Sequence, residues 1–218
     1  LTNVADQDLN NLERALEAGK RGEAILLTRL PFSRDEADAI AQTIQPAQLL
    51  LATGFDANRE LALSPQLRQF RIIHFATHGF FHSERPDLSG LFFSTVNEEG
   101  ETRNGFVGLD EIYNLDLPAE LVVLSACETA LGQQIRGEGL IGLTRGFMHA
   151  GAKRVVASLW KVNDAATAEL MKRFYQAMLG ERRLTPAAAL RAAQLSLWKE
   201  PKWRAPYFWA SFVLQGKH

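Results

Sequence analysis

The chain has 218 residues, and at roughly 150 residues per domain this length favours one domain that can bury a sizeable core without disulfides. Its 24 basic and 25 acidic residues give a net charge of −1, and 46% of its residues are hydrophobic. These proportions argue against disorder and remove the usual electrostatic reason to expect nucleic acid or an anionic membrane as a partner. The single cysteine, Cys127, excludes an internal disulfide and argues against a zinc site.

No apolar run reaches the roughly 18–20 residues needed to cross a bilayer, and the N-terminal residues lack the basic and apolar regions of a signal peptide. We therefore expect a cytoplasmic protein without a membrane partner. Because the sequence begins without methionine, we expect residues 1–218 to be a single domain of a longer chain.

Short apolar runs alternate with helical patterns, which predicts an α/β fold around a mostly parallel sheet. Residues 1–5 are interpreted as the end of a strand. Ser33 and Glu36 have the spacing of a capping box, which predicts a helix that ends near Gln45, before Pro46. Further strands are expected, in chain order, at 48–52, 71–76, 121–125, 154–158 and 209–214.

An arm that starts at 91–93 is expected to turn back near Asn104-Gly105, a dipeptide typical of tight hairpins. No internal repeat or linker interrupts the chain. Three helices are predicted in its second half: at 139–148, from the cap Asn163-Asp164 to Gly180, and after Thr185-Pro186.

Cys127 comes just after the apolar strand predicted at 121–125. In parallel α/β sheets, ligands bind and chemistry is done at the carboxyl ends of the strands, so a thiol at this place is a candidate nucleophile. The alternative is a small buried hydrophobe, which is the usual role of a free cysteine. The position of the residue alone leaves both interpretations open.

A cysteine nucleophile needs a base, because the free thiol has a pKa of about 8.5 and the thiolate is the reactive form. His78 follows the strand predicted at 71–76 and therefore lies at the same edge of the sheet, with Gly79 after it to permit a tight turn. It precedes Cys127 by 49 residues, close to the interval of about 50 in caspases.

His74 lies inside the apolar run and is interpreted as a hydrogen-bonded core histidine. A zinc site built from His74 and His78 is rejected, because the segment has the pattern of a strand and no Glu follows His74 as the zinc-helix motif requires. We therefore expect no metal ion.

Gly137 to Gly142 form a literal G-x-G-x-x-G, the fingerprint of dinucleotide-binding folds. That fingerprint follows its strand at once, so that the pyrophosphate meets the N-terminus of the next helix. Here the first glycine comes twelve residues after Ser125. We therefore expect no cofactor and interpret these glycines as a loop and a close approach of helix to sheet.

Five segments of the sequence resemble the CHAT domain, a family of caspase-like cysteine peptidases that is related to separases and often attached to tetratricopeptide repeats. The resemblance runs from about residue 30 to 216 and is carried by Ile73 to Gly79, Leu124 to Ala130, Gly137 to Arg145, Ala157 to Trp160 and Pro206 to Phe212. It implies a caspase-like three-layer α/β/α sandwich with a mostly parallel central sheet. Members of the family serve regulated proteolysis, including prokaryotic defence and programmed cell death.

The resemblance also implies a catalytic dyad, with His78 as the base and Cys127 as the nucleophile. The backbone N–H groups of Gly79 and Cys127 would stabilise the oxyanion of the tetrahedral intermediate. His78 would then protonate the leaving amine as general acid.

Leu159 to Asp164 is similar to a tract of separases whose acid pairs with a basic residue before the scissile bond. The similarity gives Asp164 a role in binding substrate, through charge-assisted hydrogen bonds to Arg or Lys. Asp164 can instead be simply the N-cap of its helix. Glu138 is a second candidate for the acid of the pocket.

The leading hypothesis is a cysteine endopeptidase that acts on a protein or peptide and is regulated by an activating partner or an attached tetratricopeptide-repeat region. The alternative is a binding or scaffold module that has the CHAT fold and is catalytically silent. A nucleotide-binding α/β protein is a third hypothesis. Nucleic acid and membranes are not expected to contact this domain directly.

Overall fold

The computed structural model describes residue 30 and residues 32–80, 89–125, 127–128, 138–160 and 163–217. Residues 127–128 are placed as a strand and residues 138–141 as the start of a helix. The strand end predicted at 1–5 lies outside the described residues, as does most of the glycine-containing loop that precedes residue 138.

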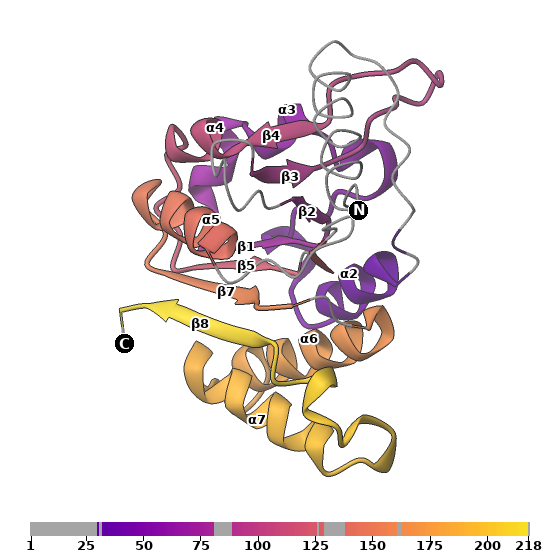
Figure 1. Ribbon diagram of the computed structural model, residues 1–218, viewed down its shortest axis with the longest axis vertical. Coiled ribbons are helices and arrows are strands. Elements are labelled where there is room, and N and C mark those ends of the chain that lie inside the picture. Colours follow the sequence, from indigo (N-terminus) through magenta and orange to yellow (C-terminus); the bar gives the residue numbers. More distant parts are fainter. Residues whose placement is uncertain are drawn as a thin grey trace, which may run out of the picture.

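A four-stranded sheet forms the centre of the fold (Figure 1). In spatial order its strands are β1 (Ile72–Phe75), β5 (Leu121–Leu124), β7 (Arg154–Ser158) and β8 (Phe212–Gly216). The first three run parallel, and β8 runs antiparallel to β7. The prediction of an α/β fold around a mostly parallel sheet is therefore confirmed.

A second sheet continues two of these strands. Its spatial order is β4 (Phe106–Gly108), β3 (Gly90–Phe92), β2 (His78–Phe80) and β6 (Cys127–Glu128). β2 follows β1 after two residues and β6 follows β5 after two residues, and β2 and β6 are again parallel. The antiparallel pair β3–β4 lies on the other side of β2.

Helices cover both faces of the central sheet (Figure 1). The short α3 (Arg59–Ala62) and α4 (Leu109–Tyr113) lie with α5 (Glu138–His149) on one face. The other face is covered by α2 (Ser33–Ala41), α6 (Asp164–Leu179) and α7 (Pro186–Trp198). Short 3₁₀ turns at Pro46–Gln48, Gly54–Asp56, Pro65–Gln69, Pro201–Trp203 and Pro206–Phe208 connect these elements.

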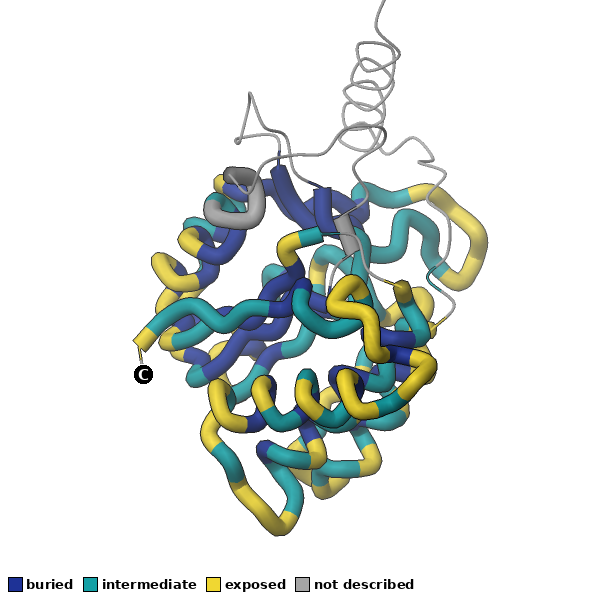
Figure 2. The backbone as a smooth tube through the Cα atoms, turned by 60° about the horizontal axis from the view of Figure 1, so that its bottom comes forward, coloured by how far each residue is buried: buried dark blue, intermediate teal, exposed yellow. Residues whose placement is uncertain are grey.

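Two hydrophobic cores follow from this arrangement, one on each face of the sheet (Figure 2). Side chains alternate along a strand, so Val122 and Leu124 point to the α4–α5 side while Leu121 and Val123 point to the α6–α7 side. All four are buried, which explains why β5 is apolar at every position. None of the helices formed by the described residues is long and apolar enough to cross a membrane.

The strand predicted at 48–52 does not form. Pro46 begins a 3₁₀ turn, and Leu49 and Thr53 then have extended backbone angles but no neighbouring strand among the described residues. A groove of about 2120 Å³ lies between this segment and β1, and both line it. The segment has the composition of a strand, but a strand also needs a neighbouring strand to pair with.

The first predicted helix differs at both ends. Ser33 does not cap it, because its hydroxyl donates to the carbonyl of Leu30 (2.9 Å), and the N-cap position, Phe32, has no side-chain hydrogen bond. The helix α2 ends at Ala41 and not near Gln45. Just after its end, the hydroxyl of Thr43 donates to the carbonyl of Ile40 at 2.7 Å, and such local side-chain hydrogen bonds compete with the helical pattern.

Two further boundaries differ from prediction. The arm after β3 turns at 97–100, where Gly100 has a φ of +80° and its N–H donates to Asn97, and not at Asn104-Gly105. The last strand begins at Phe212, not at 209, because the turn that starts at Pro206 holds the chain up to Ala210.

Candidate functional site

Three of the predicted site residues follow the carboxyl ends of neighbouring parallel strands. His78 comes after β1, Cys127 after β5 and Asp164 after β7, and these strands are adjacent in the sheet. The topology therefore brings the three residues to one edge, which is the edge where α/β proteins bind ligands.

His78 and Cys127 are direct partners across the parallel pair of β2 and β6. Gly79, the next residue of β2, is the partner of Glu128. His78 is half-buried, whereas Gly79 is buried. Neighbouring strands lie about 4.8 Å apart, so the backbones of His78 and Cys127 are as close as two strands allow.

The β3–β4 hairpin holds β2 from its other side. His78 is the antiparallel partner of Phe92, and the hydroxyl of Thr77 donates to the carbonyl of Phe92. The hairpin is in turn tied to α3, because Arg59 donates through Nε to the carbonyl of Phe106 (3.0 Å). β2 is thus fixed between two neighbours, one of which carries Cys127.

Asp164 is the first residue of α6 and is not its cap. The N-cap is Asn163, whose side-chain oxygen accepts from the backbone N–H of Ala166 at 3.1 Å. Asp164 lines a small cavity of about 10 Å³ together with Ser125, the residue after β5. The alternative in which Asp164 serves as the cap is therefore wrong, and the residue lies beside the end of β5.

The connection from β7 to α6 is held by the C-terminal segment. The N–H of Leu159 donates to the carbonyl of Ser211 (2.8 Å), and Nε1 of Trp160 donates to the carbonyl of Tyr207 (3.3 Å). The hydroxyl of Ser158 closes the turn by donating to the carbonyl of Trp160. These contacts, between residues 47 and 52 positions apart in the sequence, fix the chain that leads to Asp164.

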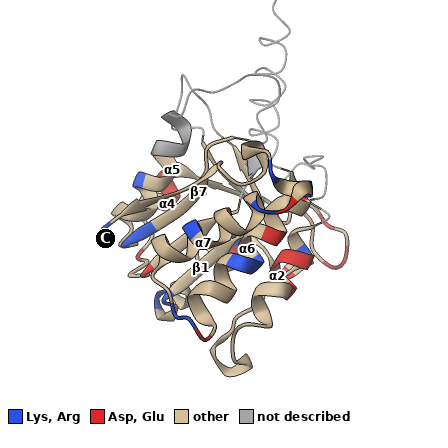
Figure 3. Cartoon of the chain, turned by 90° about the horizontal axis from the view of Figure 1, so that it is seen from below, with Lys and Arg blue, Asp and Glu red and all other residues tan. Residues whose placement is uncertain are grey.

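Glu138 is the first residue of α5, and its side chain lies outside what the structure describes. The role of Glu138 as the acid of the pocket, in place of Asp164, stays a prediction. Within the described ranges, no three side chains of His, Cys, Asp or Glu gather in a group that could hold a metal ion. Figure 3 shows acidic and basic residues interspersed over the face formed by α2, α6 and α7.

Residues 5–217 match the CHAT domain family, which is nearly the whole chain. The chain belongs to the CHAT domain family. Tetratricopeptide repeat protein 28 from Homo sapiens and its namesake from Mus musculus are each 35% identical to this CHAT domain over the matched region. The similar region covers 86% of the chain but only 8% of either relative, so the chain spans a small part of their length. The likeness is not limited to prokaryotic proteins.

The interpretation of His74 as a core histidine is confirmed, and the CHAT domain surrounds it with polar partners that sequence reasoning missed. Nδ1 of His74 lies 3.1 Å from the hydroxyl of Tyr175, and Nε2 lies 2.9 Å from Oε1 of Glu36. Burial first, and the negative charge of Glu36 second, raise the pKa of the Tyr175 hydroxyl far above its usual value. The capping box predicted from Ser33 and Glu36 is therefore wrong, because the carboxylate of Glu36 lies against His74.

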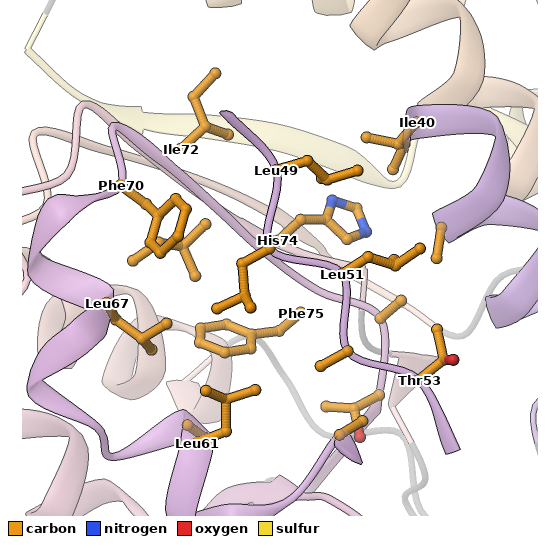
Figure 4. A pocket seen from close by; sticks show the side chains of 18 of the residues that line it. Ile40, Leu49, Leu51, Thr53, Leu61, Leu67, Phe70, Ile72, His74 and Phe75 are labelled. Atoms are coloured by element: carbon orange, nitrogen blue, oxygen red, sulfur yellow. The ribbon is translucent and has the colours of Figure 1, made fainter. Parts of the chain in front are cut away.

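The groove beside β1 extends along the whole strand (Figure 4). His78, beyond the end of the strand, is also among the residues that line it. Apolar and polar residues both line it, and Leu49 and Leu51 lie near the ring of His74 in the close-up view. Leu51 is 45% exposed, so part of this apolar lining is open to solvent. The groove lies along the edge strand of the central sheet, and His78 is at one end of it.

Proposed function

We propose that this CHAT domain is a cysteine endopeptidase in which His78 is the base and Cys127 the nucleophile. The observation that supports the proposal best is the direct pairing of these two residues across β2 and β6. An imidazole and a thiol on adjacent strands at that separation are within reach of one another. The position at the carboxyl edge of a parallel sheet supports it further.

The reaction follows from the chemistry of the two side chains. His78 accepts the proton of the Cys127 thiol, and the thiolate attacks the carbonyl carbon of the scissile peptide bond. The carbonyl oxygen becomes an oxyanion, which the N–H groups of Gly79 and Cys127 would stabilise. His78 returns its proton to the leaving amine, and water then hydrolyses the thioester to release the second product and the free thiol.

Asp164 would select the substrate by binding a basic side chain before the scissile bond. The supporting observation is that Asn163 caps α6, so the carboxylate of Asp164 is not needed for that purpose. A carboxylate at the edge that carries the dyad would pair with Arg or Lys. Glu138, at the start of α5, is the second candidate for the same role.

The test is turnover of fluorogenic peptides that end in Arg or Lys, measured for the unchanged protein, Cys127→Ala and His78→Ala. We expect Cys127→Ala to be inactive and His78→Ala to lose about 10²–10⁴-fold, the usual contribution of a general base. A matched peptide that ends in Glu should be cleaved far more slowly than the basic ones. Equal turnover by the unchanged protein and Cys127→Ala would contradict the proposal.

A catalytically silent scaffold is the second candidate. It is favoured by the relatives, which are long tetratricopeptide repeat proteins of which the similar region is a small part. In either case we propose that an attached repeat region or a partner bound to it regulates or recruits the domain. A scaffold would bind its partners equally well with His78→Ala and Cys127→Ala. Neither substitution would change peptide turnover, and His78→Ala would leave the reactivity of the Cys127 thiol unchanged.

A further inference from the structure

A chain of three buried polar side chains lies beneath the dyad and joins β1 to the two helices that pack on it. Glu36 comes from α2, His74 from the middle of β1 and Tyr175 from α6. The side chains of Glu36 and His74 are 5% and 14% exposed, and Tyr175 is 1% exposed. Polar groups buried this deeply are costly unless they are paired, so their mutual contacts matter.

The two ring nitrogens of His74 are used in opposite directions. Nε2 lies 2.9 Å from Oε1 of Glu36, which is the distance of an ion pair. Nδ1 lies 3.1 Å from the hydroxyl of Tyr175, which is the distance of a hydrogen bond. The ring of His74 is therefore held at both ends, by residues from different helices.

The rest of β1 offers no comparable anchor. Ile72, Ile73 and Phe75 make apolar contacts only, and apolar contacts tolerate small shifts along the strand better than directional polar ones do. In Figure 4 the ring of His74 lies among apolar side chains such as Ile40 and Leu51. His74 is the one residue of β1 whose side chain has polar contacts, a hydrogen bond with Tyr175 and an ion-pair contact with Glu36.

The position of β1 along its own direction decides which residue lies opposite Cys127. Ile72 of β1 pairs with Leu121 of β5, and His78 of β2 pairs with Cys127 of β6. The partner is 49 residues further along the chain in both pairs, so one register continues from the central sheet into the site. A shift of one residue would replace Cys127 by a neighbour opposite His78 and would reverse the side-chain faces.

We propose that His74, held by Glu36 and Tyr175, is a positioning residue that keeps His78 in register with Cys127. It contacts neither the substrate nor the reacting atoms. It acts through the backbone of β1, which leads directly into β2. The proposal rests on the function proposed above, because it supposes that the pairing of His78 with Cys127 activates the thiol.

The experiment measures the rate of alkylation of Cys127 by iodoacetamide between pH 5 and 9. Cys127 is the sole cysteine of the chain, so the rate reports this thiol alone and needs no substrate. A thiol paired with an imidazole is largely ionised near pH 7, whereas an ordinary thiol is only a few per cent ionised there. His78→Ala defines the profile of the unpaired thiol.

We expect His74→Ala and Glu36→Ala to lower the rate at pH 7 by about tenfold and to move the profile toward that of His78→Ala. His74→Gln should restore much of the rate, because its amide can still donate to Glu36. If His74→Ala does not fold, Glu36→Gln and Tyr175→Phe test the same contacts, because both side chains keep almost the same shape. We expect the same change of the alkylation profile in these two variants. Ile73→Ala is the matched control, since it removes a buried side chain of the same strand outside the polar chain.

A merely structural role would lower the melting temperature of the His74 variants and leave the alkylation profile unchanged, as we expect for Ile73→Ala. That result would overturn the positioning role and leave the dyad intact. An unchanged protein that already alkylates like an ordinary thiol, with no effect of His78→Ala, would overturn the dyad and the positioning role together.

Discussion

Asn163 caps α6 through its side-chain oxygen, which accepts the backbone N–H of Ala166 at 3.1 Å. The next residue, Asp164, is the first residue of the helix and does not serve as its N-cap, although its position at the start of an amphipathic helix suggests that role. A helix needs one cap at this place, and the geometry assigns it to the amide and not to the carboxylate.

Substitutions of Asn163 and Asp164 should consequently have different effects on stability and on peptide turnover. Asn163→Ala should lower the free energy of unfolding by about 1 kcal/mol, the usual cost of a lost N-cap. Asp164→Asn should cost less than that, because asparagine keeps the size of the side chain and one accepting oxygen, while turnover of peptides with Arg or Lys falls. Urea unfolding and peptide cleavage on the same two variants check both. A stability loss in Asp164→Asn as large as that in Asn163→Ala would contradict the assignment.

Stability at alkaline pH should depend on Tyr175. The pKa of its hydroxyl is raised in the folded state by burial and by Glu36, so the neutral form stabilises the fold below the ordinary pKa of about 10. Above that pH the unfolded chain releases the proton more readily, and stability falls by up to about 1.4 kcal/mol per pH unit. The free energy of unfolding, measured from pH 9 to 11, should therefore fall less steeply with pH in Tyr175→Phe than in the unchanged protein.

Tyr207, which is half exposed, supplies the control for that experiment. Tyr207→Phe should leave the pH dependence as it is in the unchanged protein. An equal slope for Tyr175→Phe and the unchanged protein above pH 10 would show that the buried hydroxyl does not couple to folding.

Gly90 should not tolerate a side chain. A Cβ there would lie 2.3 Å from the carbonyl oxygen of Val107 and 2.5 Å from the ring of Phe106, which belong to the neighbouring strand. Gly90→Ala should therefore destabilise the protein by about 1–3 kcal/mol or more and loosen the hairpin that holds β2. Thermal unfolding measures the loss.

Gly142 is the matched control for that substitution, because among the described residues a Cβ there would meet a side-chain carbon of Leu109 at 3.4 Å and nothing closer. It lies inside α5, where alanine favours the helix over glycine by about 1 kcal/mol. Gly142→Ala should be neutral or stabilising. A loss similar to that of Gly90→Ala would contradict this reading.

Leu170 should be among the positions where truncation costs most. It is fully buried on α6, against the face of the sheet that α7 also covers. Leu170→Ala should cost about 2–5 kcal/mol through lost burial and the cavity left behind. Leu195→Ala, on the 40% exposed side of α7, should cost less than about 1 kcal/mol, and denaturant unfolding of the two variants compares them.

Elements with strong local signals were predictable. β7 has the predicted bounds, and α7 begins at Pro186 after the cap Thr185 as expected. The end of α6 at Leu179 follows from Gly180, which is the expected stop. In each case a residue next in sequence supplies the physical cause, whether a cap, a fixed φ or an apolar run covered on both faces.

Elements that depend on a distant partner were not predictable. The segment after Pro46 has the composition of a strand but lies across a groove from β1. The spacing of Ser33 and Glu36 indicates a capping box, yet Glu36 turns inward because a buried histidine offers it a better partner 38 residues away. Nothing within four residues of Glu36 signals that partner.

The sequence by itself determined the α/β class, the helices and strands with local start and stop signals, and the candidate residues His78, Cys127 and Asp164 at strand ends. Only the tertiary structure decided the register that sets His78 against Cys127, because pairing between strands 49 residues apart depends on packing that no local pattern encodes. It also decided that Glu36, His74 and Tyr175 meet, since their contacts join two helices and a strand that are brought together only when the core forms.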